Sequence, residues 1–164
     1  MTWTGREESV ACCDGLGPVQ DNEAVCRILI KRTVEPLFYT WFARKDLFPD
    51  GVFSNVCGTQ DGLSVDRSSN LSDDEVSSRS AARAALGNNR MSNGGLQAEV
   101  SAIRAIARWD DPSNAFRIYD DPLQNNLQHA VIRGCENIPD EDRASLMIEL
   151  EELFTTPRGD FKGH

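Results

Sequence analysis

The sequence lacks the long hydrophobic runs and the glycine motifs that identify several large classes of protein. No apolar run approaches the roughly 20 residues that span a bilayer, and no secretory signal follows the first residues. Neither a G-x-x-x-x-G-K-[S/T] loop nor a three-glycine dinucleotide motif is present. We therefore expect a cytoplasmic protein that makes no membrane contact and requires no cofactor.

Cysteines and histidines at the short spacings of zinc or redox sites are also missing. An odd number of cysteines at irregular spacings is not typical of a disulfide framework, and the histidines do not stand at metal-ligand spacings. We expect free thiols, most of them packed in the interior, and no metal site. The residues concerned are Cys12, Cys13, Cys26, Cys57, Cys135, His129 and His164.

Positive charge is in short supply. The 164 residues carry 17 Lys and Arg against 26 Asp and Glu, a formal net charge of -9. This balance repels phosphate backbones and anionic lipid headgroups, which argues against direct nucleic-acid binding and against a membrane surface. The length corresponds to one domain that can bury a core of its own.

Short strands and helices alternate along the chain. Apolar and alternating patterns predict strands at 25–30, 62–67, 115–119 and 129–133. A capping box from Ser72 to Glu75 begins a helix that extends to Leu86, and helices are also predicted over 97–109 and after Pro139. Composition makes 88–95 a loop, although Leu96–Val100 can also be read as a strand that leads into the following helix.

These patterns predict one compact α+β domain over residues 21–155. It should hold a small mixed or antiparallel sheet and about three helices, with flexible segments at 1–20 and 156–164. The apolar stripe of the last helix is expected to include Ala144, Met147, Leu150, Leu153 and Phe154. The strand order and the oligomeric state stay open.

Polar residues at the ends of two predicted strands could form a ligand site. His129 is the candidate acid–base residue, Arg67 would bind an anionic group, and Asp66 or Asp120 would orient them. The structural alternative is a hydrogen-bonded histidine, a salt bridge and turn-forming aspartates at Asp120 and Asp121.

Two of these segments also resemble part of a known protein group. Small uncharacterised bacterial proteins contain segments that are similar to G-L-S-V-D-R at 62–67 and to D-D-P-L-Q-N-N-L-Q-H-A-V-I at 120–132. The resemblance as a whole covers about two-thirds of the chain. Leu127 and Gln128 stand where that group has a Pro-Ala pair. The resemblance implies a bacterial cytosolic setting and directs attention to four residues, Asp66, Arg67, Asn126 and His129.

Two main classes of function remain, and a third is considered beside them. The net charge and the lack of a catalytic motif favour an interaction module that binds a protein with a basic surface, as immunity proteins, antitoxins and defence accessories do. Its contact residues would be the aromatic Tyr39, Trp41 and Phe42 and the acidic Glu149 and Glu152. The alternative is a small enzyme that uses His129 and Arg67; mimicry of DNA by the acidic surface is a third possibility.

Overall fold

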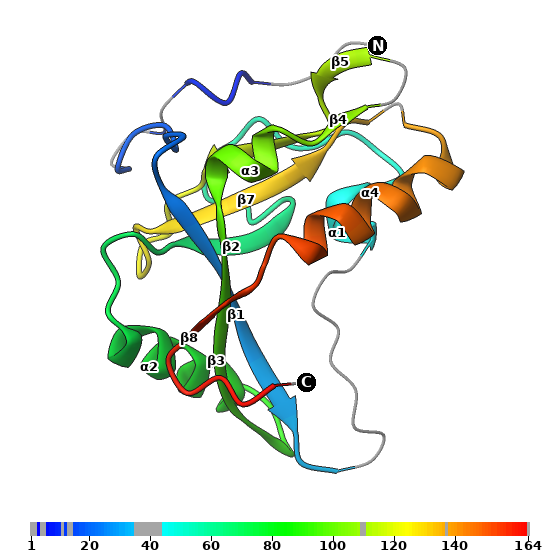
Figure 1. The fold of residues 1–164 in the computed structure, drawn as a ribbon. Coiled ribbons are helices and arrows are strands. Elements are labelled where there is room, and N and C mark those ends of the chain that lie inside the picture. Colours follow the sequence, from blue (N-terminus) through cyan, green and yellow to red (C-terminus); the bar gives the residue numbers. More distant parts are fainter. Residues whose placement is uncertain are drawn as a thin grey trace.

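The fold is built on one antiparallel sheet of six strands, in the order β6-β7-β2-β1-β3-β8 (Figure 1). The computed structural model describes residues 3, 6–10, 12, 15–34, 44–108, 111–136 and 138–163, without the side chains of 108 and 111–114. The strands are β1 (Ala24–Arg32), β2 (Leu63–Arg67), β3 (Arg90–Glu99), β6 (Phe116–Asp120), β7 (His129–Gly134) and β8 (Thr156–Arg158). A separate ribbon pairs β4 (Ala107–Arg108) with β5 (Asp111–Asn114).

Helices cover both faces of this sheet. The helix α2 (Asp73–Ala84) packs against β1 and β3 on one face, and the other face meets α1 (Arg44–Leu47), α3 (Val100–Arg104) and α4 (Asp140–Glu152) (Figure 1). Strand β1 shows this division, because Val25 and Leu29 belong to the main core while Cys26 and Ile28 pack beneath α2. The predicted α+β class is confirmed.

The alternation of a strand explains which side chains share a face. The side chains of Leu63 and Val65 in β2 enter the main core, so Ser64 and Asp66 point to the α2 face. Asp66 pairs in register with His129 across β2 and β7, which places both side chains on that face.

The strand predicted near 25–30 and those at 62–67, 115–119 and 129–133 are confirmed, as is the capped helix α2. The loop at 88–95 and the helix at 97–109 are wrong, because β3 occupies Arg90–Glu99 and only Val100–Arg104 is helical before β4. The pairing of β3 with β1 along eight positions outweighs the local preference of its glycines and asparagines.

The apolar stripe of α4 agrees with the predicted one at four of five positions. Leu150 and Phe154 are buried, and Met147 and Leu153 are partly buried against the same core. Leu146 is also buried, which was not predicted, and Ala144 is exposed. Ile148 is 53% exposed. A helix has 3.6 residues per turn, so two neighbouring stripes fit nearly the same sequence and only the direction of packing selects one of them.

The expectation of free thiols throughout is wrong, because Cys12 and Cys57 form a disulfide across 45 residues of sequence. Folding brings the two sulfurs together, and the spacing of the two cysteines in the sequence does not predict this pairing. Cys26 and Cys135 are buried and form no disulfide, as expected, and Cys13 lies outside the described residues.

Contacts with the rest of the fold are also made by residues outside the predicted domain bounds of 21–155. On the N-terminal side, Glu8 accepts a hydrogen bond from the Ile118 backbone of β6, and Cys12 is held by its disulfide. At the other end, β8 pairs with β3, and Asp160 accepts a hydrogen bond from Ser92. Apolar side chains of both segments also meet the core, since Val19 belongs to it and Trp3 and Phe161 pack against it.

Candidate functional site

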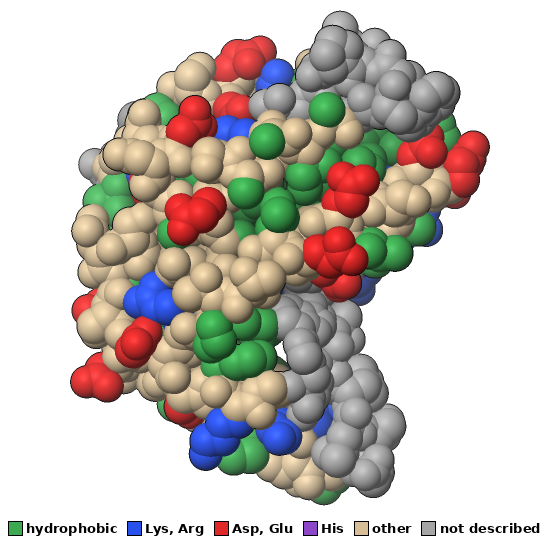
Figure 2. All heavy atoms as spheres, in the orientation of Figure 1, with side chains coloured by type: hydrophobic (Ala, Val, Ile, Leu, Met, Phe, Trp, Pro, Cys, Tyr) green, Lys and Arg blue, Asp and Glu red, His purple; other side chains and the backbone are tan. Residues whose placement is uncertain are grey.

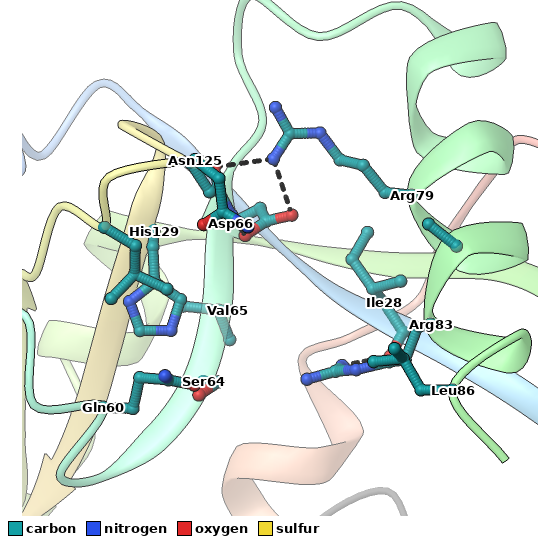
Figure 3. Close-up of a pocket in the computed structure, with 13 residues that line it drawn as sticks. Ile28, Gln60, Ser64, Val65, Asp66, Arg79, Arg83, Leu86, Asn125 and His129 are labelled. Atoms are coloured by element: carbon teal, nitrogen blue, oxygen red, sulfur yellow. Dashed lines mark hydrogen bonds and ion pairs between the residues drawn. The ribbon is translucent and has the colours of Figure 1, made fainter.

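A cavity of about 580 Å³ lies between β2 and α2, and the loop between β6 and β7 closes one side of it. Figure 3 shows Ser64, Asp66 and His129 on the sheet side and Arg79 and Arg83 on the helix side. The volume falls in the range of roughly 300–1,000 Å³ that is usual for small-molecule sites. The cavity therefore brings two of the three predicted catalytic residues, Asp66 and His129, to one place.

His129 is held in a fixed orientation by Asp121, directly after β6. The Nδ1 atom of the imidazole lies 2.8 Å from the Asp121 carbonyl oxygen and 3.1 Å from its carboxylate. Both neighbours are acceptors, so Nδ1 carries a proton, and in the neutral ring Nε2 has a free lone pair. Nε2 is buried and has no hydrogen-bond partner among the described residues. Such an oriented nitrogen is suited to accept a proton.

The Asp121 carboxylate is itself bound by a tight turn, Cys57–Gln60. The backbone N–H groups of Gly58 and Gln60 donate to its two oxygens over 2.7 and 3.0 Å. Both donor residues have positive φ angles, 76° and 58°, which direct the N–H groups inward. Burial raises the pKa of Asp121, but the hydrogen bonds from His129 and the turn outweigh it, so the pKa lies below its usual value.

Asp66 belongs to a network with three side chains from other elements. Arg79 donates to it over 3.0 Å, and Asn126 donates to its second oxygen over 2.9 Å. Arg79 also bonds Asn126 at 2.7 Å and Gln128 at 2.9 Å. Figure 3 shows the contact between Arg79 and Asp66. Asp66 is thus neutralised and fully bonded, so it fixes α2 against the sheet and does not act as a free base.

Arg67 does not reach the cavity, contrary to its predicted role. It points to the opposite face of the sheet, where it forms a bidentate pair with Glu23 at 2.8 and 2.7 Å and contacts Asp120 at 3.1 Å. The carbonyl oxygens of Gly17 and Pro18 accept its other N–H groups. Successive residues of a strand face opposite sides, so Asp66 and Arg67 cannot share one site.

Asp120 follows the same rule. It faces Arg67 and is fully buried, while its neighbour Asp121 faces His129. Burial raises the pKa of Asp120, and Arg67 only partly offsets this effect. The salt bridge expected as the structural alternative is therefore present on one face, and the orienting carboxylate lies one residue further along on the other.

The cavity carries a local excess of positive charge in an acidic protein. Asp66 and Arg79 neutralise each other, whereas Arg83 makes no salt bridge within the described ranges and donates one hydrogen bond to the Ile28 carbonyl at 3.1 Å. Sequence reasoning missed Arg79 and Arg83, and it named Asp121 among the strand-end aspartates without giving it the orienting role. The helical spacing of Arg79 and Arg83 from the apolar Val76 was the available signal that both arginines face the sheet, and Val76 is indeed fully buried.

Metal ligation has no support in the described part of the chain, where no group of three His, Cys, Asp or Glu side chains is placed to hold an ion. Nor does any helix that the structure describes have the length and apolar character needed to cross a membrane.

The predicted contact residues for a protein partner are divided. Tyr39, Trp41 and Phe42 lie outside the described residues. Glu149 and Glu152 are exposed on α4, next to the exposed Ile148. Figure 2 shows acidic side chains beside hydrophobic ones over the part of the surface that α4 forms.

Comparison of this chain with protein-family models, with curated proteins and with solved structures found no match. The functional argument therefore rests on the site itself.

Proposed function

We propose that the protein is a small acid–base enzyme whose substrate carries a carboxylate or phosphate group. In this proposal the substrate binds between β2 and α2, with His129 as the proton acceptor and Arg83 as the partner of the anionic group. A cytoplasmic location, as expected from the sequence, is part of the proposal. The observation that carries it is the imidazole of His129, a residue that lines the cavity, with Nδ1 fixed by a buried carboxylate and Nε2 buried and unpartnered among the described residues.

Chemically, the arrangement supports transfer of one proton. The Nε2 lone pair takes a proton from the bound molecule, and the Asp121 carboxylate stabilises the imidazolium that forms. The cation of Arg83 offsets the negative charge of the substrate at the helix side of the cavity. Arg79 already bonds three partners, so its role is to hold the wall that contains Asp66 and Asn126.

The test is a panel of 2-oxo acids, hydroxy acids and phosphate esters, followed by 1H NMR in D2O. At least one compound should bind saturably and exchange or lose a proton. His129→Gln should lower that rate by about 10²–10⁴-fold, while His164→Gln, at the only other histidine, should leave it unchanged. Arg83→Ala should weaken binding, with the exposed Arg90→Ala as its control. Equal rates for the wild type and His129→Gln, or no saturable binding, would refute the proposal.

A second candidate, the interaction module, is supported by the surface of α4. Ile148 is an apolar side chain, 53% exposed, beside the carboxylates of Glu149 and Glu152, and in this candidate it anchors a protein with a basic surface. Affinity capture from the native host at low and moderate salt tests this. A stoichiometric partner should be retained by wild type and lost from Glu149→Gln/Glu152→Gln.

The control for that experiment removes the same charge elsewhere. Asp50→Asn/Asp74→Asn changes two exposed carboxylates that lie outside α4 and should retain the partner. Equal retention by both double variants, or recovery of the protein alone, would count against the α4 surface.

A further inference from the structure

We infer that the Cys12–Cys57 disulfide is redox-active and that its reduction releases His129 from its fixed orientation. The inference concerns the geometry of His129 and does not depend on a substrate. It connects two observations from different parts of the chain: the chemical surroundings of the disulfide, and the position of Cys57 at the start of the turn that binds Asp121.

The first observation is the environment of the two sulfurs. Cys57 is exposed and Cys12 is buried. The Arg6 guanidinium lies 2.9 Å from the Cys12 sulfur and 3.4 Å from that of Cys57, and is held there by the carbonyl of Asp120 at 2.5 Å. Arg6 also lies over the Tyr119 ring, 5.2 Å from its centre. An accessible sulfur and a cation beside its bonded partner favour thiol–disulfide exchange.

The exchange is written for a dithiol reductant. Its thiolate attacks the exposed sulfur of Cys57, the Cys12–Cys57 bond breaks, and Cys12 leaves as a thiolate whose charge Arg6 stabilises. The second thiolate of the reductant then attacks the reductant sulfur of the mixed disulfide and releases Cys57. Both protein thiolates take protons from water. The protein disulfide has gained two electrons and two protons, and the dithiol has become a disulfide.

The second observation is a direct chain of contacts from Cys57 to the cavity. Cys57 begins the turn whose next members, Gly58 and Gln60, donate both of their backbone N–H groups to the Asp121 carboxylate. That carboxylate and its own carbonyl hold Nδ1 of His129. The disulfide fixes one end of this turn to Cys12, so its loss removes a covalent restraint one residue away from the first donor.

The cytosolic setting expected from the sequence is compatible with this chemistry, because disulfides that form in a reducing cytosol are usually transient or redox-sensing. Two other thiols that the structure describes, Cys26 and Cys135, are buried, and burial raises the pKa of the Cys26 thiol to about 12. Both are therefore poorly placed to take part in the exchange.

The first test measures reduction of the folded protein. Native protein is treated with dithiothreitol without denaturant and alkylated, and its molecular mass is measured by mass spectrometry. We expect two more alkylated cysteines than in the untreated protein, and a reduction rate about tenfold slower in Arg6→Ala but unchanged in the exposed Arg44→Ala. Reduction that occurs only in denaturant, or at equal rates in wild type and Arg6→Ala, would overturn the inference.

The second test reads the geometry of His129. In the oxidised protein, 15N NMR should show a single tautomer with the proton on Nδ1, assigned by its loss in His129→Gln. After reduction, both tautomers should be populated while the circular-dichroism spectrum stays that of the folded protein. The same change should appear in Cys12→Ala/Cys57→Ala without any reductant. An unchanged tautomer in the reduced protein, or unfolding on reduction, would show that the disulfide is purely structural.

Discussion

Asp120 and Asp121 are adjacent carboxylates whose pKa values shift in opposite directions from 3.8. Burial raises the pKa of Asp120, and the nearby Arg67 does not fully compensate. Burial also acts on Asp121, but the hydrogen bonds from His129, Gly58 and Gln60 outweigh it and lower its pKa. Folding therefore favours the protonated form of one residue and the ionised form of the other.

We expect Asp121→Asn and Asp120→Asn to change the pH dependence of unfolding in opposite ways. The stability contributed by Asp121 is present above pH 3.8 and is lost as the pH falls through its lower folded pKa. That of Asp120 is present below pH 3.8 and is lost as the pH rises through its higher folded pKa. Each variant should remove the pH dependence of unfolding that its carboxylate contributes: the part below pH 3.8 for Asp121→Asn and the part above pH 3.8 for Asp120→Asn.

Urea unfolding between about pH 2 and pH 6 measures both profiles. At neutral pH, Asp121→Asn should also lower the free energy of unfolding by roughly 1–3 kcal/mol. The amide nitrogen of the new side chain cannot accept the hydrogen bonds that the carboxylate accepts. Profiles parallel to that of the wild type would contradict the assignment of the two carboxylates to opposite faces.

The sequence was sufficient to predict part of this site. The alternation of 62–67 and the apolar 130–132 placed Asp66 and His129 on two strands, which are neighbours in the sheet. It was not sufficient to choose between Asp120 and Asp121, because that choice depends on where β6 ends relative to β7. Nor could it reveal that Arg67 is fully engaged by residues 17–23, since those contacts form only in three dimensions.

At the scale of elements, α2 depends on its N-terminal cap. The Ser72 side chain accepts a hydrogen bond from the Glu75 backbone at 3.1 Å, and Glu75 bonds back to the Ser72 backbone. Ser72→Ala should lower the free energy of unfolding by about 1 kcal/mol. Ser78→Ala, at an exposed position inside the same helix, should leave it unchanged or raise it by a few tenths of a kcal/mol. Equal effects in thermal or urea unfolding would show that the cap is not formed.

The strand β3 depends on close backbone approach at Gly95. A Cβ atom there would lie 2.4 Å from the Cys26 sulfur and 2.9 Å from the Arg27 carbonyl oxygen. Gly95→Ala should therefore destabilise the protein by about 1–3 kcal/mol. Gly51→Ala meets nothing within 4 Å and should be nearly neutral, which makes it the matched control in urea unfolding. A neutral Gly95→Ala would argue against the packing of β3 on β1.

The same glycine explains why this element was mispredicted. Gly94 and Gly95 are typical of a loop, and the residues that follow have helical spacing. In the structure, Gly95 allows β3 to lie against β1 beneath Val76 of α2. Elements with a strong local signal, such as α2 and β2, could be predicted, whereas β3 is determined by neighbours that are distant in sequence.

At the scale of the whole molecule, Arg158 of β8 joins the C-terminal residues to the rest of the fold. It bonds Asp73 at 2.6 Å and also Gln97 and the carbonyl of Leu71. Arg158→Ala should lower the free energy of unfolding by roughly 2–3 kcal/mol, because it leaves several acceptors without partners. The exposed Arg90→Ala should change it by less than about 0.5 kcal/mol. Equal, small effects in urea unfolding would show that the contacts of Arg158 contribute little to stability.

Among the strands that the structure describes, β6 lies at one edge of the sheet, and this affects how molecules of this protein meet each other. An edge strand offers its unpaired N–H and C=O groups to any extended chain, including that of another copy. Glu8 occupies one such position by accepting the hydrogen bond of the Ile118 N–H at 2.9 Å, and Arg104 holds Glu8 there at 3.2 Å. Since Cys12 tethers the same segment, we expect reduced protein at high concentration to polymerise edge to edge sooner than oxidised protein.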